Sequence, residues 1–411
     1  MKNPLSELLK LNNDEKKNLG IIHTASEISN QISLWDDTYQ RVKNKIKELD
    51  GFISDFLNKK NPYIIFTGAG TSEFIGLCLI SLYNNSLNIP CFVCPSPELV
   101  VCPENYLLRN HTPLLVSFAR SGNSPESTGA LKFVNGLSPD TRNIVITCNK
   151  DGKLVNEAAK MSYTFPIILS EKTNDMGLAM TSSFTNLLVA GQSIAYYKNL
   201  QAYEKKLHTM KELGTAIMDS AAIKAEELSR KSFNRAVFLG SNSNLGTAKE
   251  SALKLQELTS GQVMCTYDTF LGFRHGPEAV VDKNTLVIGY LSCDKYRARY
   301  EIELLNELKS KNLGATIVVL AEKSLKKELS EITEHIIVFE QPEHHGLEDE
   351  LLPPVLVIFA QLLGLFKSLD LGLQPDNPSK TGAIHRVVKG VKIYDYLRFK
   401  DKGEFQIIAE R

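Results

Sequence analysis

The chain has 411 residues, of which 43% are hydrophobic and 23% are charged. These proportions exclude a collagen-like, disordered or disulfide-scaffold chain, and the length suits two or three domains of about 100–200 residues each. Lys plus Arg and Asp plus Glu both number 47, so the formal net charge is zero. A chain without net basic charge lacks the electrostatic signature of nonspecific binding to nucleic acids or anionic membranes.

The cysteines and the apolar runs both bear on the location of the protein in the cell. Seven cysteines are scattered along the chain, and an odd number favours free thiols over a disulfide framework. Cys91 and Cys94 form one C-x-x-C pair, but no second pair follows at zinc-ribbon spacing, so we expect neither a metal nor a cofactor. The N-terminus lacks an apolar stretch of signal-peptide length, and the longest apolar run, 351–366, is shorter than the ~18 residues that span a bilayer. We therefore expect a cytoplasmic protein without membrane or nucleic-acid partners, with 351–366 as a buried helix.

The first half of the chain alternates between helical and strand patterns. Apolar residues at helical spacing predict a helical extension over 1–50. Short β-rich runs then alternate with helical stretches, and most of these runs are too apolar for a sheet that is covered on one face only. The predicted strands of this half are 63–68, 91–94, 113–119, 143–148 and 163–169.

The second half repeats the first. Two glycine-containing segments, TGAGTSEFIG (67–76) and LGSNSNLGTA (239–248), each follow an apolar strand and open a helix, 172 residues apart. Such a repeat indicates two similar α/β domains with doubly wound parallel sheets. The predicted strands of the second half are 235–240, 263–268, 285–291, 315–321 and 335–340. The expected organisation is a helical extension over 1–50, a first domain over 51–200, a linking helix over 201–232, a second domain over 233–372 and a C-terminal tail over 373–411.

The turn after the first predicted strand suits the binding of an anion. Gly68 and Gly70 allow a tight turn, and Thr71 and Ser72 add hydroxyls to the free N–H groups of the first helical turn. The nucleotide-binding patterns that end in Gly-Lys-Ser/Thr or read G-x-G-x-x-G are both absent. Taken alone, the segment is better explained as a tight turn with a Thr or Ser N-cap.

A second polar turn changes that balance. The segment SFARSGNSPES (117–127) follows the third predicted strand, and within it Ser121, Gly122 and Asn123 supply N–H groups and a hydroxyl, while Ser124 is the expected N-cap. The carboxyl ends of parallel strands meet at one edge of a sheet, where ligands bind. Hydroxyls that converge from two such turns suit a phosphate monoester held without a metal.

Three charged residues lie on one side of a predicted helix in the second half. Glu250, Lys254 and Glu257 are spaced i, i+4 and i+7, and they fall within a stripe about 60° wide. The ordinary explanation is an exposed, salt-bridged face. His275 follows in a loop bounded by Gly and Pro, and a carboxylate with a histidine forms a usual pair for proton transfer. The pattern leaves both a solvated face and a catalytic site open.

These segments resemble the sugar isomerase (SIS) domain, a family of phosphosugar-binding α/β modules. The segment GLAMTSSFT (177–185) is similar to a stretch in the isomerase half of glucosamine-6-phosphate synthase. At the end of the third predicted strand, that enzyme has Ser and Gln at the positions of Ala119 and Arg120. A cation at position 120 would still favour a phosphate. The resemblance implies two three-layer α/β/α domains in tandem. The phosphate and sugar ligands that it implies are Gly70, Thr71, Ser72, Arg120, Ser121, Gly122, Asn123, Ser124 and Thr181.

The resemblance also implies catalytic residues. In the synthase a run ALKxxE precedes an HGP loop, which makes Glu257 the carrier of the C1/C2 proton, Lys254 its charge partner and His275 the group that assists ring opening. The family's histidine comes from the neighbouring subunit, so at least a homodimer is implied. Lys380, in QPDNPSK (374–380), matches the lysine that forms a Schiff base with the open-chain sugar. The alternative for this residue is a solvated loop lysine.

Nearly the whole chain is similar to the AgaS group of this family. Five segments carry the similarity: TGAGTSEFIG, SFARSGNSPES, ESALKLQELT, GFRHGP and PDNPSKTGAIHRVVKGV. The group is described both as galactosamine-6-phosphate deaminase/isomerase and as tagatose-6-phosphate ketose/aldose isomerase. The galacto configuration of the substrate is therefore implied by the resemblance alone.

The choice between those two activities depends on nitrogen. We expect no glutaminase domain, because nothing before residue 50 could release ammonia from glutamine. Free ammonia is scarce, so mass action favours deamination of a hexosamine phosphate, giving tagatose 6-phosphate and ammonia from galactosamine 6-phosphate. A simple aldose–ketose isomerase is the second expectation. A non-catalytic phosphosugar-binding regulator is the third, although the sequence shows no clear DNA-binding head.

Overall fold

The computed structural model describes residues 3–342, 346–379, 381–388 and 390–397. In that part of the chain the strands form two sheets of five, and neighbouring strands are parallel throughout. The strand order is β2-β1-β3-β4-β5 in the first sheet and β7-β6-β8-β9-β10 in the second, so both sheets have one topology. The chain therefore has the two doubly wound α/β units that the sequence predicts.

The strands begin and end within one residue of the predicted runs, because most of their apolar side chains are buried. In β4 and β8, for example, every residue is buried. The first sheet contains β1 (Pro62–Gly68), β2 (Cys91–Pro95), β3 (Thr112–Ala119), β4 (Arg142–Thr147) and β5 (Thr164–Ile168). The second sheet contains β6 (Arg235–Gly240), β7 (Met264–Asp268), β8 (Thr285–Tyr290), β9 (Thr316–Glu322) and β10 (His335–Phe339).

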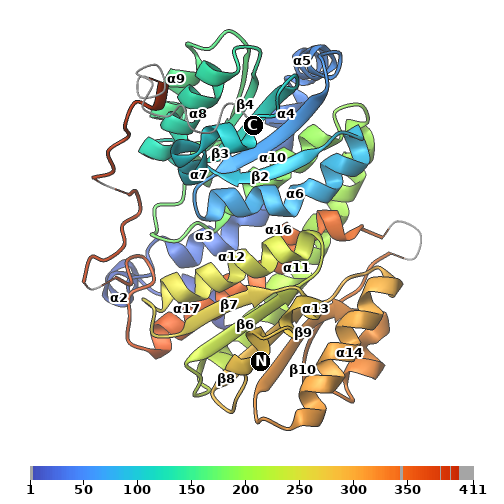
Figure 1. Ribbon diagram of the computed structural model, residues 1–411. Coiled ribbons are helices and arrows are strands. Elements are labelled where there is room, and N and C mark those ends of the chain that lie inside the picture. The colour runs from blue at the N-terminus through green and yellow to red at the C-terminus, as the bar shows by residue number, and fades with distance from the viewer. Residues whose placement is uncertain (1–2, 343–345, 380, 389, 398–411) are drawn as a thin grey trace.

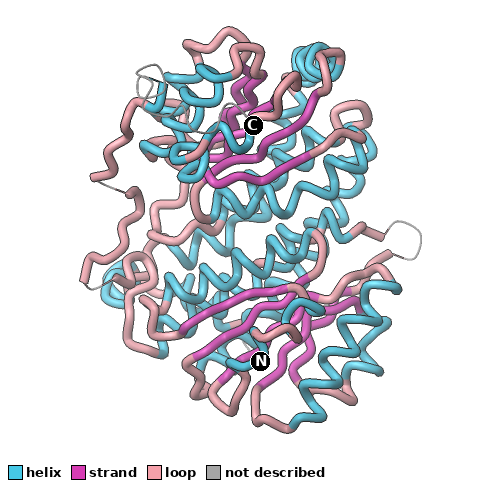
Figure 2. Tube along the Cα trace, viewed as in Figure 1, coloured by secondary structure: helices cyan, strands magenta, loops and turns pink. Residues whose placement is uncertain are grey.

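Helices fill the space between the two sheets and cover the outer face of each (Figure 2). A large hydrophobic core joins the sheets through the middle helices, and a smaller core lies under the outer helices of each sheet. The middle helices include α6 (Thr71–Leu87), α10 (Ser182–Ala195), α11 (Leu200–Ser229), α12 (Ser243–Leu258) and α17 (Ile358–Asp370). The outer helices include α7 (Ser96–Val101), α8 (Pro125–Leu137) and α9 (Lys153–Ala158) on the first sheet and α14 (Lys295–Lys311) on the second.

The N-terminal segment contributes to the middle core. It forms α1 (Pro4–Lys10), α2 (Asn13–Leu19), α3 (Thr24–Asn30), α4 (Trp35–Lys43) and α5 (Ile46–Leu57). Trp35 is fully buried, and its indole N–H donates to the Thr185 hydroxyl at 3.2 Å. The buried hydroxyl of Thr38 donates to the Asn186 side chain at 2.7 Å. These contacts join α4 to α10, so the N-terminal helices pack as part of the core.

Among the described residues, one helical span, Pro353–Asp370, has the length and hydropathy to cross a bilayer. Inside this structure 89% of it is buried. It consists of α16 (Pro353–Leu356) and α17, which pack against α11 and α12 between the sheets. The span is therefore a core helix, which confirms the burial predicted for 351–366.

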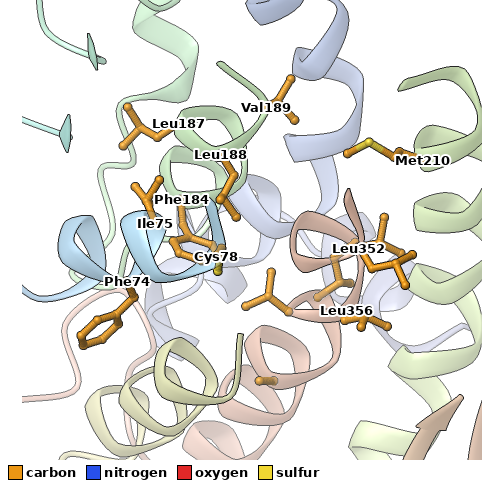
Figure 3. Packing of buried hydrophobic residues seen from close by; sticks show 14 of the residues in the cluster. Phe74, Ile75, Cys78, Phe184, Leu187, Leu188, Val189, Met210, Leu352 and Leu356 are labelled. Atoms are coloured by element: carbon orange, nitrogen blue, oxygen red, sulfur yellow. The ribbon is translucent and has the colours of Figure 1, made fainter. Parts of the chain in front are cut away.

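Helices α6 and α12 open from corresponding turns of the two units and pack against each other between the sheets. Figure 3 shows Cys78 of α6 beside Phe184 in the middle core. A Cβ atom on Gly246 of α12 would lie 2.5 Å from the Cys78 sulfur and 2.7 Å from the Cys78 backbone nitrogen. Only glycine permits this approach, and the approach fixes the distance between the units.

We expect Gly246→Ala to lower the melting temperature. The added methyl group meets a backbone atom that no rotamer change can move, and overpacking of this kind costs about 1–3 kcal/mol. Gly51→Ala is the matched control, because Gly51 lies within α5 and a Cβ there has nothing within 4 Å. Thermal unfolding of both variants tests the contact, and equal melting temperatures would contradict it.

Candidate active site

A cavity of about 120 Å³ lies where the strand order of the first sheet reverses. Open parallel sheets bind ligands at this position, beyond the carboxyl ends of their strands. Four parts of the chain line it: the turn after β1 with the start of α6, the end of β3 with the following turn and the start of α8, the loop before α10, and the C-terminal tail. Its lining residues are Ala69, Ser72, Phe118, Ala119, Arg120, Ser121, Gly122, Ser124, Ser127, Met180, Arg386, Val387 and Val388. We call this cavity the cradle.

The turn after β1 is shaped by two glycines. A Cβ on Gly68 would lie 2.5 Å from the backbone of Ser72, and Gly70 has a φ of +55°. The turn can therefore close tightly enough for α6 to begin at Thr71 with Ser72 in the wall of the cradle. Ser72 is one of the predicted ligands that the structure places in the cavity, whereas Gly70 and Thr71 adjoin it without lining it.

The turn after β3 forms the opposite wall. Ser121, Gly122 and Ser124 line the cradle, and Gly122 adopts a φ of +63°. Ser124 occupies the N-cap position of α8, but its hydroxyl donates to Glu126 at 2.5 Å and makes no capping hydrogen bond, which corrects the capping role expected from the sequence. Asn123 does not line the cavity, and its side-chain oxygen accepts the backbone N–H of Lys153.

Arg120 lines the cradle but is largely occupied by the backbone. Its Nη1 donates to the carbonyl oxygens of Gly177 and Leu178 at 3.3 and 3.1 Å, and its Nη2 donates to the carbonyl of Arg386 at 2.6 Å. Burial lowers the pKa of Arg120, with Asp175 opposing this effect and the charge of Arg386 adding to it. Arg120 therefore clamps the wall of the cradle, a use that sequence reasoning did not foresee.

Asp175 organises the loop that Arg120 clamps. It is 1% exposed and accepts the backbone N–H groups of Thr181, Ser182 and Ser183 at 2.8, 3.2 and 2.8 Å, at the start of α10. The Thr181 hydroxyl also faces Asp175, at 3.4 Å, and Thr181 does not line the cradle. The sequence did not reveal Asp175, because an acid six residues before the N-cap lacks the usual capping spacing.

Two further carboxylates tie the same loop to distant segments. Glu27 accepts the N–H groups of Met176 and Gly177, and burial, with the charge of Asp175, raises the pKa of Glu27 to about 7. Asp376, at the start of the tail, accepts the N–H and hydroxyl of Thr24 at 2.7 Å each. The N-terminal helices, the loop and the tail are thereby held together beside the cradle.

Lys254 is buried at the contact between the two units. It is 1% exposed, and its amine lies 2.6 Å from Glu257 Oε2 and 3.4 Å from Glu250 Oε1. It also donates to the Thr71 hydroxyl at 3.0 Å. Since Glu250 is fully buried as well, the solvated face that remained open from the sequence is excluded. The contact with Thr71 connects the charged residues of α12 to the start of α6.

Burial and the neighbouring charges make the ionised form of Glu250 less favourable than that of Lys254. Burial raises the pKa of Glu250 to about 8, an effect that Lys254 opposes and Glu257 reinforces. Burial disfavours the charged amine of Lys254, but Glu250 and Glu257 outweigh burial and raise its pKa. In the described structure neither oxygen of Glu250 accepts a hydrogen bond. A protonated Glu250 therefore leaves one ion pair, Lys254–Glu257, and Glu257 is the member with solvent access, at 24% exposure.

His275 and Lys380 stand apart from this arrangement. His275 follows α13 (Phe270–Phe273), its side chain is exposed, and it does not line the cradle. Lys380 lies outside the described residues. Within the described part of one chain, the predicted residues brought to the cradle and its border are therefore those of the two turns and of α12.

The second unit has turns that correspond to both turns of the cradle, and a carboxylate of its own occupies the one after β8. Asn242 before α12 has φ and ψ of 53° and −128°, and Gly70 before α6 has 55° and −127°. In the second unit Asp349 accepts the Ser292 hydroxyl, the Cys293 N–H at 2.8 Å and Arg297 Nη1 at 2.5 Å, beyond the end of β8. A carboxylate thus fills the position that corresponds to the cradle.

Comparisons with known proteins decide the family. The SIS domain family matches residues 56–196. A D-galactosamine-6-phosphate deaminase AgaS from Shewanella sp. (strain ANA-3) is 33% identical over 393 residues, which are 95% of this chain and 96% of that protein. The chain belongs to the AgaS family of SIS-domain proteins. The AgaS assignment confirms the resemblance that the sequence motifs indicated.

Solved structures agree with membership of the AgaS family. A structure from Clostridium novyi NT has 36% identity and a TM-score of 0.89, covering 96% of this chain and 100% of that one. The tagatose-6-phosphate ketose/aldose isomerase from Escherichia coli has 32% identity and a TM-score of 0.81, covering 91% and 96%. The C-terminal domain of glucosamine-fructose-6-phosphate aminotransferase from Francisella tularensis, at 22% identity and a TM-score of 0.73, shares the fold; the match covers 90% and 100%.

In this AgaS-family chain, Glu250→Gln should change how stability depends on pH. The raised pKa of Glu250 means that the folded protein retains a proton that the unfolded chain releases above about pH 4.5, so this group's contribution to stability falls as the pH rises toward 8. The variant lacks that loss. Its free energy of unfolding should gain on that of the unaltered protein between about pH 6 and pH 8, by at most about 1.4 kcal/mol per pH unit, and its melting temperature should rise relative to the unaltered protein accordingly.

Melting curves at constant ionic strength measure this gain. Glu48→Gln, on an exposed face of α5, is the control and should run parallel to the unaltered protein. If Glu250→Gln also ran parallel, the carboxyl would titrate normally and the argument for a single buried ion pair would fail.

Proposed function

We propose that the protein converts galactosamine 6-phosphate and water into tagatose 6-phosphate and ammonia. The observation that carries the proposal is the buried contact of Lys254 with both Glu257 and Thr71, which sets a carboxylate beside a cavity walled by serines. The naming of AgaS relatives from Shewanella and from Escherichia coli O157:H7 as D-galactosamine-6-phosphate deaminases supports the choice of substrate.

The proposed chemistry begins with the phosphate in the cradle. Ser72 and Ser121 offer hydroxyls there, and Ser124 adds a third when its hydroxyl exchanges Glu126 for the phosphate. The turn after β3 adds backbone N–H groups, which completes a set that binds a phosphate without a metal. Anchoring the phosphate brings the other end of the open-chain sugar toward Glu257. Binding energy from a nonreacting group is thereby used to position the reacting carbons.

Glu257 then acts as the base. Its carboxylate removes the proton from C2 of the open-chain aminoaldose and returns a proton to C1, which leaves an imine at C2. Water adds to the imine carbon, and the C2–N bond breaks to release ammonia and the ketose phosphate. One water is consumed and no electron acceptor is needed. Lys254 keeps the Glu257 carboxylate in place through their 2.6 Å contact.

Simple isomerisation is the second candidate. The Escherichia coli structure at 32% identity is a tagatose-6-phosphate ketose/aldose isomerase. The same Glu257 would move a proton between C1 and C2 of a sugar that carries no nitrogen. Ammonia release distinguishes the two reactions directly.

A cytoplasmic location is part of the proposal. All seven cysteines are free thiols, which is the usual state in a reducing compartment.

Glu257→Gln should abolish most of the activity. The amide keeps the shape of the side chain but cannot accept the C2 proton, so kcat should fall by about 100-fold or more. Ammonia release from galactosamine 6-phosphate is the assay, with glucosamine 6-phosphate as the comparison substrate and Glu48→Gln as the control variant. If the unaltered protein released ammonia from neither sugar, the deaminase function would be rejected.

We also propose that His275 serves the cradle of a second copy of the chain. In one chain its side chain is exposed and does not line the cradle. Apolar side chains are exposed nearby, on the edge strand β7 and in the following α13: Met264 is 62%, Tyr267 38% and Leu271 43% exposed. An exposed apolar edge beside a candidate acid supports association of two chains.

Mixing two inactive variants tests this sharing. If Glu257 and His275 of different chains form one site, Glu257→Gln and His275→Asn should each be inactive alone. After exchange of subunits, random pairing leaves one intact site in half of the dimers, which restores about a quarter of the normal activity. No recovery, despite proven subunit exchange, would place His275 outside the shared site.

A further inference from the structure

The C-terminal strap, residues 381–388 and 390–397, crosses the first unit beside the cradle. Figure 1 shows this red segment leaving the end of α17 and running along the first unit toward α9. It contains the sequence RVVKGV, whose first three residues, Arg386, Val387 and Val388, line the cavity. The proposed reaction has so far given this segment no part.

The strap is held by specific contacts with α8, the helix that opens from the SGNS turn. Two glycines of α8 make room for it, because a Cβ on Gly129 would lie 3.1 Å from Ile393, and one on Gly136 would collide with Leu397. Tyr396 packs against Phe133 of α8, with ring centroids 5.9 Å apart, and donates its hydroxyl to Glu104 at 2.7 Å. Docking of this kind fixes where the residues ahead of it lie.

Arg386 is oriented by the loop that Asp175 organises. Its Nε donates to the Asp175 carbonyl at 2.8 Å, and its Nη2 donates to the Asn174 side chain at 2.9 Å. Its own carbonyl accepts the Nη2 donor of Arg120. In the described structure no protein group accepts a hydrogen bond from Nη1 of Arg386, so this nitrogen keeps its donors for a ligand.

The charges around the cradle favour an anion. Arg386 lies close enough to Arg120 for its positive charge to lower the pKa of the Arg120 guanidinium. Asp175, the carboxylate that acts most strongly on Arg120, already accepts the N–H groups at the start of α10. A phosphate dianion would relieve this repulsion and accept the unused donors.

We propose that Arg386 of the strap, rather than Arg120, supplies the cation that binds the phosphate of the substrate. Arg120 donates from both of its terminal amino groups to carbonyl oxygens, whereas Arg386, which lines the cavity, donates from Nε and Nη2 and retains Nη1. The proposal rests on the phosphosugar function given above. It makes the strap a part of the binding site that closes over one side of the cradle.

Three variants test the assignment. Arg386→Gln should raise the KM for galactosamine 6-phosphate by about 10- to 100-fold with kcat changed by less than about threefold, because a charge-assisted bond to the phosphate is lost and the base is untouched. Arg386→Lys keeps the charge but loses the fork, so it should recover part of the affinity. Lys392→Gln is the matched control, since Lys392 is an exposed cation of the same strap that does not line the cradle.

Inorganic phosphate gives a readout that does not depend on turnover. Its dissociation constant, measured by calorimetry, should rise in Arg386→Gln by a factor similar to that of KM and stay unchanged in Lys392→Gln. The unaltered protein could release no ammonia while phosphate binding is still lost in Arg386→Gln. The deaminase function would then be rejected, and the assignment of the phosphate site would stand. Unchanged phosphate affinity in Arg386→Gln, or no phosphate binding by the unaltered protein, would overturn the assignment.

Discussion

The buried amine of Lys254 is the constraint on which the site depends. An ammonium group in the interior is tolerated only where anions and acceptors surround it, and here they come from both units: Glu250 and Glu257 from α12 and Thr71 from α6. Those contacts require the two helices to lie against each other, which the glycine at position 246 permits. Fold and chemistry are therefore linked, because the packing that joins the units also connects Glu257, through Lys254, to the turn that leads into the cradle.

The two units have diverged around one topology. Their first turns share the same backbone conformation, at Gly70 and at Asn242, and in the first unit the cradle lies beyond the strands that flank this turn. In the second, Asp349 satisfies the hydroxyl, N–H and guanidinium donors that an anionic ligand would otherwise meet. The first unit thus retains the cradle, while the second contributes the helix that carries Glu257. A single site made from two unequal repeats follows from this division.

The sequence predicted what depends on local pattern. Strand positions follow from runs of apolar residues. The turns at Gly70 and Gly122 follow from the glycines themselves, because glycine adopts positive φ angles readily. The spacing of Glu250, Lys254 and Glu257 placed them on one side of a helix but did not show what covered that side, since burial comes from α6, almost 180 residues earlier. The roles of Asp175 and Arg386 were equally hidden, because their partners lie in segments that no short motif joins.

The arrangement of like charges at the cradle explains why a phosphate can direct the reaction. Arg120 and Arg386 carry like charges within a partly buried wall, and the loop carbonyls that accept hydrogen bonds from both guanidinium groups offset their repulsion. A dianion removes the repulsion only when it sits between the strap and the SGNS turn, so the gain in binding depends steeply on position. A ligand held that firmly at one end has little freedom at the other, which is how the proposed chemistry confines the reacting carbons near Glu257. Affinity for the phosphate is thereby converted into orientation at C1 and C2.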